Sequence, residues 1–186
     1  VDLWVREEDV YGQIRDDNIN RTFLPDIKLL PNLRPVKTLK EAVKDKDLIM
    51  MVVPSQYFRD VLTKLRPYLD ADMSIISAAK GIENNTLKIM SQVAEEILPE
   101  QYIERFSCLA GPSFAREVAE KKPAAVTIAC RDLARAEKLQ KVFSTEFFLH
   151  FPIHKKQASF TVHIYFQISH NITPSTFLKT ALAFSK

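Results

Sequence analysis

A chain of 186 residues is long enough for one domain with a hydrophobic core, and 46% hydrophobic and 26% charged residues are typical of a globular protein. The net charge of +3 comes from scattered basic residues without a basic stripe carrying interleaved aromatics, which argues against nucleic-acid binding. No apolar run reaches the roughly 18 residues that a membrane span needs, and no signal-peptide pattern opens the sequence. We therefore expect a cytoplasmic protein.

Cysteine, histidine and glycine usage narrows the chemistry. Cys108 and Cys130 each lie within an apolar run, and we interpret them as reduced core thiols rather than as a disulfide or a metal pair. The histidines have no spacing that suggests a metal set; they are His150, His154, His163 and His170. The chain has only 3 glycines, where average usage would give roughly 13. Whatever it binds, it binds without a glycine-rich loop of its own.

Predicted strands and helices alternate along the chain. Apolar runs predict strands over residues 1–6, 34–37, 48–53, 73–79, 106–110 and 124–130. The segments that follow them predict helices over residues 7–18, 38–46, 54–66, 86–98, 112–120 and 132–143. Residues 19–33, with Pro25 and Pro31, are expected to form a loop. This alternation predicts an α/β fold with a doubly wound, mostly parallel sheet.

Local signals support these assignments. Residues 48–53 are continuously apolar, as in strands buried on both faces of a parallel sheet. The apolar residues of the next helix recur with helical spacing, at Phe58, Val61, Leu62 and Leu65. Thr38 and Glu41 have the spacing of a capping box, and Thr86 and Asp132 are predicted to cap two later helices.

A sheet of this kind binds ligands at the carboxyl ends of its strands. The residues that follow the predicted strands are therefore the candidates for a site: Arg6, Pro54–Ser55, Lys80–Gly81 and Gly111–Pro112–Ser113.

Lys80 follows the predicted strand 73–79 directly. One interpretation is a solvated lysine at a turn, with Gly81 supplying a positive φ. The other is a fixed cation in the ligand crevice that holds a phosphate or polarises a carbonyl. The spacing alone leaves both open.

Gly111 and Ser113 stand between a predicted strand and a predicted helix. This segment is either an ordinary strand-to-helix turn or an anion site at the free amides of a helix start. Two of the chain's 3 glycines, Gly81 and Gly111, lie just after predicted strands, which favours a ligand site. Arg6 ends the first strand, where an arginine accommodates the 2′-phosphate of NADP in dinucleotide-binding folds, although an arginine alone is weak evidence.

Several blocks of sequence together resemble a known family. VDLWVR, FLPDIKLLPNL, MMVVPSQ, AAKGIE, LAGPSFAREVA and KPAAVTIA follow one another in this order. They resemble the bacterial NAD(P)-dependent glycerol-3-phosphate dehydrogenases over residues 1–148. VVPS, KGIE and GPSFA with EVA are specific as a set, and no single block would suffice.

The resemblance implies a Rossmann-like NAD(P)-binding domain, here partial, followed in the family by a helical domain. It implies interconversion of dihydroxyacetone phosphate and sn-glycerol 3-phosphate with NADPH or NADH, and a homodimer in the intact enzyme. Lys80 would contact both cofactor and substrate, Gly111 and Ser113 the substrate, and Ala115 the cofactor. Arg6 would contact the adenosine end, where its charge favours NADPH.

The sequence departs from the family pattern at both ends. It begins with Val1 at what would be the second strand, so we expect one βα unit with its glycine-rich turn, and thus the central strand of the sheet, to be missing. Residues 149–186 show no resemblance, and the family's general-acid lysine has no counterpart. We expect this tail to come from a frameshifted or truncated reading frame. The chain is then either part of a working dehydrogenase or a non-catalytic remnant that binds phosphate or nucleotide.

Overall fold

The computed structural model of the protein describes residues 1–154 and 180–184. Its strands are β1 (Asp2–Trp4), β2 (Ile19–Asn20), β3 (Leu24–Lys28), β4 (Arg34–Val36), β5 (Leu48–Val52), β6 (Ser74–Ser77), β7 (Phe106–Ala110), β8 (Ala124–Cys130), β9 (Phe148–His154) and β10 (Thr180–Phe184). Its helices are α1 (Glu8–Asp17), α2 (Leu39–Val43), α3 (Ser55–Leu65), α4 (Met90–Ile97), α5 (Glu100–Ile103), α6 (Ala115–Ala119) and α7 (Leu133–Phe143), with a 3₁₀ turn at Arg66–Tyr68. The predicted alternation of strands and helices is confirmed.

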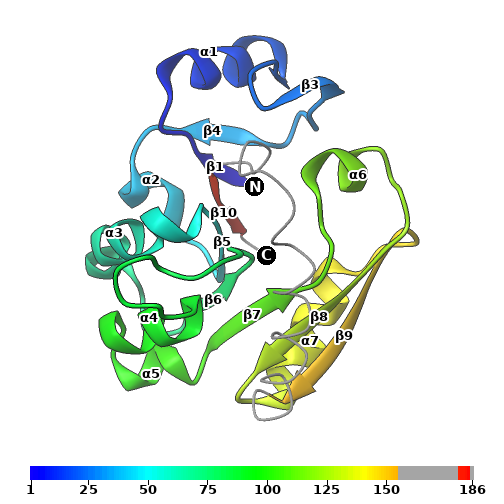
Figure 1. Cartoon of the computed structure of the whole chain (residues 1–186). Helices are drawn as coiled ribbons and strands as arrows, with labels where there is room; N and C mark the ends of the chain where they lie inside the picture. Colours follow the sequence, from blue (N-terminus) through cyan, green and yellow to red (C-terminus); the bar gives the residue numbers. More distant parts are fainter. Residues whose placement is uncertain (155–179, 185–186) are drawn as a thin grey trace.

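The main sheet has the strand order β4-β1-β10-β5-β6-β7-β8-β9 (Figure 1). β1 pairs parallel with β4, and β5, β6 and β7 pair parallel with one another. β10 is antiparallel to both β1 and β5, so β1, β4, β5, β6 and β7 all run in one direction. β8, β9 and β10 run in the opposite direction. The expected Rossmann-like, mostly parallel sheet is confirmed.

The centre of the sheet differs from the expectation that a strand would be missing there. β10 lies between β1 and β5, with Ala183 opposite Asp2 and Val52 opposite Thr180. An unpaired strand edge exposes a row of amide and carbonyl groups, and β10 pairs those of both neighbours. The expectation of an open centre was therefore wrong.

The expected change of character at residue 148 stays a prediction. β9 begins at Phe148 and pairs with β8 as far as His154 opposite Cys130, so the sheet continues past that boundary. Residues 155–179 and 185–186, which make up most of the expected tail, lie outside the described residues.

The sheet has a hydrophobic core on each face. Ile49 and Met51 of β5 are fully buried in a cluster with α3, α4 and α5, as their alternation along the strand requires. Leu48 belongs to a second cluster with Leu139 of α7, against which Met50 and Val52 pack. The prediction that residues 48–53 form a strand buried on both faces is confirmed.

Two of the predicted helix starts are confirmed and one is wrong. Thr38 and Glu41 form the capping box, and the Asp132 carboxylate accepts a hydrogen bond from the Ala134 amide. Thr86 does not cap a helix, because its hydroxyl donates to the Glu83 carboxylate instead and α4 begins only at Met90.

Three further boundaries also differ. The first strand ends at Trp4, and the helix expected over 112–120 is the short α6, whose N-cap is Phe114. Part of the expected loop at 19–33 is an antiparallel hairpin of β2 and β3. Pro25 is tolerated in β3 because that strand lies at the edge of a two-stranded sheet.

Candidate functional site

The candidate residues lie at one edge of the sheet. Because β1, β5, β6 and β7 run in the same direction, their carboxyl ends share that edge. Arg6 follows β1, Ser55 follows β5, Lys80 follows β6 and Gly111 follows β7. The structure thus places these sequence-predicted residues where a doubly wound sheet binds ligands.

Lys80 is anchored across two strands. Its ammonium donates a hydrogen bond of 2.9 Å to the carbonyl oxygen of Leu109 at the end of β7. Burial lowers the pKa of Lys80 to about 8, and the neighbouring Cys108 on β7 opposes that change in part. Leu109 is the one hydrogen-bond acceptor of Lys80 among the described residues, and an ammonium has three donors, so further donors remain for a bound anion.

Gly81 brings the Lys80 turn against the start of α3. Its φ is +121°, and a Cβ built there would lie 2.7 Å from Oγ of Ser55. The Ala78 amide also donates to the Met51 carbonyl at 2.9 Å, which extends the β5–β6 pairing to the edge. A side chain at position 81 would push this turn away from α3.

Gly111 is needed for the turn after β7. Its φ is +126°, and a Cβ would lie 3.0 Å from the carbonyl oxygen of Ala125 and from Cα of Val126. Ser113 and Ala115 follow on the segment that enters α6, and both are half-buried. Since α6 begins at Ala115 with Phe114 as its N-cap, Ser113 lies before the helix rather than in its first turn.

Arg6 is exposed beside α3. Its guanidinium carbon lies 5.7 Å from the centre of the Tyr57 ring, within the range of a cation–π contact. Arg6 and Lys80 therefore flank the first turn of α3, one through Tyr57 and the other through Gly81 against Ser55. Among the described residues Arg6 makes no ion pair with a carboxylate, which leaves its charge available to a phosphate.

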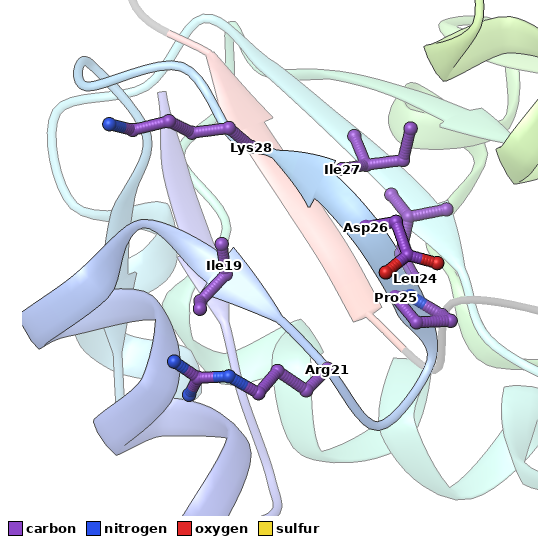
Figure 2. Close-up of a pocket in the computed structure, with 7 residues that line it drawn as sticks. All are labelled: Ile19, Arg21, Leu24, Pro25, Asp26, Ile27 and Lys28. Atoms are coloured by element: carbon purple, nitrogen blue, oxygen red, sulfur yellow. The ribbon is translucent and has the colours of Figure 1, made fainter.

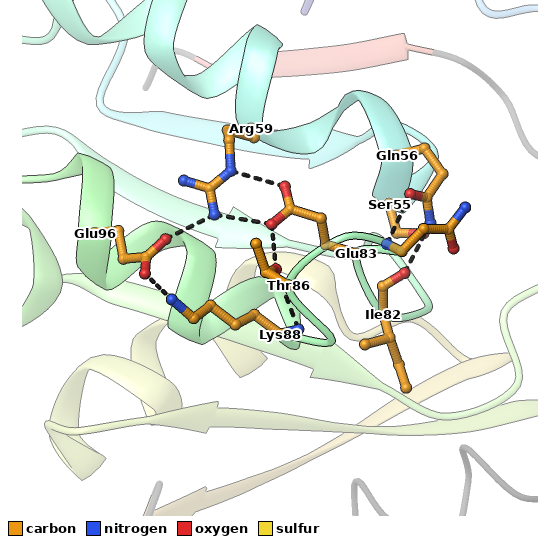
Figure 3. A network of polar contacts seen from close by, with 9 residues as sticks. Ser55, Gln56, Arg59, Ile82, Glu83, Thr86, Lys88 and Glu96 are labelled. Atoms are coloured by element: carbon orange, nitrogen blue, oxygen red, sulfur yellow. Dashed lines mark hydrogen bonds and ion pairs between the residues drawn. The ribbon is translucent and has the colours of Figure 1, made fainter.

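A network that the sequence did not reveal ties the loop after Lys80 to α3 and α4 (Figure 3). Arg59 donates to both oxygens of Glu83 at 2.7 and 2.8 Å, and to Glu96 at 2.7 Å. Arg59 and then Thr86 hold the pKa of Glu83 down to about 2. The block KGIE offered one signal, a carboxylate three residues after Lys80, but its partner 24 residues earlier was not identifiable from sequence.

An open hollow of about 430 Å³ lies elsewhere, on the β2–β3 hairpin (Figure 2). It is lined by Ile19, Arg21, Leu24, Pro25, Asp26, Ile27 and Lys28. None of the candidate site residues lines it. Arg116 of α6 reaches this hairpin, donating to the Pro25 carbonyl at 3.0 Å. The hollow lacks the anchored, half-buried lysine found at the sheet edge, and that edge is the better candidate site.

Other kinds of site find no support within residues 1–154 and 180–184. No cluster of three or more His, Cys, Asp or Glu side chains there has metal-binding geometry. No helix in this part of the chain is both long and apolar enough to cross a membrane. Cys108 and Cys130 form no disulfide, and Sγ of the buried Cys130 lies 3.7 Å from the Phe106 carbonyl oxygen.

Comparison with known proteins decides the family. The model of the N-terminus of NAD-dependent glycerol-3-phosphate dehydrogenase matches residues 1–136. The chain belongs to this family. The resemblance inferred from the sequence blocks is thereby confirmed.

Relatives and solved structures agree with this assignment. The glycerol-3-phosphate dehydrogenases (NAD(P)+) of Syntrophotalea carbinolica and Syntrophobacter fumaroxidans are 43% and 45% identical over 148 residues, which is 80% of this chain and 44% of theirs. The glycerol-3-phosphate dehydrogenase structure from Coxiella burnetii has a TM-score of 0.73 at 26% identity, over 81% of this chain and 45% of that one. That from Plasmodium falciparum has a TM-score of 0.73 at 26% identity, over 82% and 43%. The chain thus spans less than half the length of these relatives.

Proposed function

We propose that the chain is the nucleotide-binding part of a cytoplasmic dehydrogenase that interconverts dihydroxyacetone phosphate and sn-glycerol 3-phosphate with NADPH or NADH, acting as a homodimer when intact. The observation that carries the proposal is Lys80, a half-buried cation whose ammonium is anchored at the carboxyl edge of the sheet. A desolvated ammonium held in place stabilises negative charge more strongly than a solvated one. The substrate of this reaction offers both a phosphate and a carbonyl oxygen to such a group.

Each predicted site residue has a role in this proposal. Lys80 contacts cofactor and substrate, and stabilises the oxygen on which negative charge develops as hydride reaches the carbonyl carbon. Gly111 and Ser113 line the substrate, and Gly111 permits the tight turn against β8 that carries this segment past the end of β7. Ala115 and Arg6 line the cofactor. The nicotinamide cofactor supplies or accepts the hydride.

Arg6 supports NADPH over NADH. Its guanidinium is exposed at the end of β1 and has only the Tyr57 ring as a described partner. Arginine recognises phosphate with several parallel hydrogen bonds, so a 2′-phosphate would satisfy it better than a ribose hydroxyl.

A second candidate is a non-catalytic remnant that binds phosphate or nucleotide without turnover. The observation that favours it is β10, which occupies the centre of the sheet in the antiparallel direction.

One experiment separates the two candidates. Residues 1–148 replace the matching segment of the Syntrophobacter fumaroxidans enzyme, and oxidation of NADPH is followed with dihydroxyacetone phosphate. The first proposal predicts turnover by this chimaera. A well-folded chimaera that binds NADPH but does not turn over would instead support the remnant.

A further inference from the structure

Gln56 of α3 forms two hydrogen bonds to the backbone of the loop that follows Lys80. The Gln56 side-chain amide donates to the Ile82 carbonyl at 2.7 Å, and its oxygen accepts from the Asn84 amide at 3.0 Å. The two bonds together fix the loop on both sides of Glu83 (Figure 3). Because Gln56 is uncharged, these two hydrogen bonds do not depend on pH.

Arg59, one helical turn further along α3, holds the same loop by hydrogen bonds to the carboxylate of Glu83. The bidentate pair with Glu83 is partly buried, since Glu83 is only 9% exposed while the Arg59 side chain is 35% exposed. The third bond of Arg59, to Glu96 of α4, makes α3 and α4 one support. Glu96 is also paired with Lys88 at the far end of the loop.

The contacts from Gln56 and those from Arg59 both act within four residues of Lys80. Upstream, Lys80 is held by the end of β6, and downstream by the contacts to Ile82, Glu83 and Asn84. Gly81 between them has no side chain to resist the close approach to Ser55. The backbone of Lys80 is therefore held on both sides, and its side chain can donate a hydrogen bond to the Leu109 carbonyl.

We propose that Gln56 and Arg59 are positioning residues, which hold the loop after β6 so that the Lys80 ammonium stays desolvated against β7. This positioning role matters for catalysis only if the proposed function of Lys80 is correct. The titratable group that faces Lys80 from β7 is Cys108, while the Glu83 carboxylate is neutralised by Arg59. A released loop would let water reach the ammonium and remove the cause of its altered titration.

The test measures how Lys80 titrates in the full 186-residue chain. Acetic anhydride labels free amines in competition with a reference amine, from about pH 6 to about pH 11, and mass spectrometry quantifies the Lys80 peptide. The unchanged chain should show a midpoint near the pKa of about 8. Gln56→Ala and Arg59→Met should each raise the midpoint by about one pH unit or more, toward the ordinary value of 10.5.

Arg131→Met is the matched control. Arg131 also pairs with several carboxylates, on Glu95, Glu100 and Glu104, but it lies after β8, whose end adjoins the start of β7 rather than the Lys80 edge. It should lower stability as Arg59→Met does and leave the Lys80 midpoint unchanged.

Two results would overturn the proposal. One is an unchanged midpoint in a folded Gln56→Ala chain, which decides the matter even if Arg59→Met fails to fold, since Gln56 is exposed and uncharged. The other is an equal shift in the Arg131→Met control. Neither result depends on turnover, so a failure of the proposed dehydrogenase activity is recognised separately, in the chimaera.

Discussion

Replacing Lys80 with methionine should remove the dependence of stability on pH that this residue creates. Burial lowers the pKa of Lys80 from 10.5 to about 8 in the folded protein. Each unit of pKa difference corresponds to about 1.4 kcal/mol, so the charged lysine destabilises the fold by about 3 kcal/mol below pH 8. Methionine retains much of the side-chain volume without the charge.

The direction of the pH effect follows from proton binding. Between pH 8 and 10.5 the unfolded chain keeps the proton on Lys80 while the folded chain has released it. Because the unfolded state binds more protons in this window, the free energy of unfolding rises with pH, by about 3 kcal/mol in total. Below pH 8 both states are protonated and this contribution is constant.

Urea unfolding of both chains between pH 7 and pH 10.5 measures this effect. Other lysines and tyrosines titrate in both proteins, so the difference in unfolding free energy between them isolates Lys80. At pH 7 Lys80→Met should be the more stable by about 1 kcal/mol, because the lost bond to Leu109 offsets part of the gain. A difference that does not change with pH would refute the claim that Lys80 is a desolvated cation.

Three further substitutions test the local geometry by urea unfolding at neutral pH. Gly111→Ala should destabilise the fold by about 2–4 kcal/mol, because Gly111 has a positive φ and a Cβ there would press against β8. Gly12→Ala, in open space on α1, should instead stabilise the fold by about 0.5–1 kcal/mol. Equal effects of the two substitutions would contradict this geometry. Ser107→Ala should raise stability by about 1 kcal/mol, since the buried Ser107 hydroxyl has no partner within the described part of the chain, and a loss would reveal a hidden bond. Thr38→Ala should lower stability by about 1 kcal/mol, and no change would mean that the capping box contributes little.

The elements set by local chemistry could be predicted from the sequence. The apolar run at 48–53, the capping box at Thr38 and the cap at Asp132 all depend on residues a few positions apart. The position of Lys80 at the ligand edge followed from strand direction alone. These features need no knowledge of distant partners.

Features that depend on distant pairing were missed. β10 joins residues near 182 to β1 and β5, which no local pattern reports. Thr86 was assigned to a helix start because its chemistry suits one, but Glu83, fixed by Arg59 from another helix, takes its hydroxyl. The β2–β3 hairpin contains Pro25 and the positive φ of Asp26, both of which ordinarily indicate a loop.

The most direct test of the central claim compares Lys80→Met with Lys64→Met in the chimaera that carries residues 1–148. Lys64 is an exposed lysine on α3 that pairs with Asp60, and it should be dispensable. The account predicts that Lys80→Met lowers kcat/KM for dihydroxyacetone phosphate by about 10²- to 10³-fold, as expected for loss of a preorganised charge, while Lys64→Met leaves it unchanged. Normal turnover by a folded Lys80→Met chimaera would contradict the role given to Lys80.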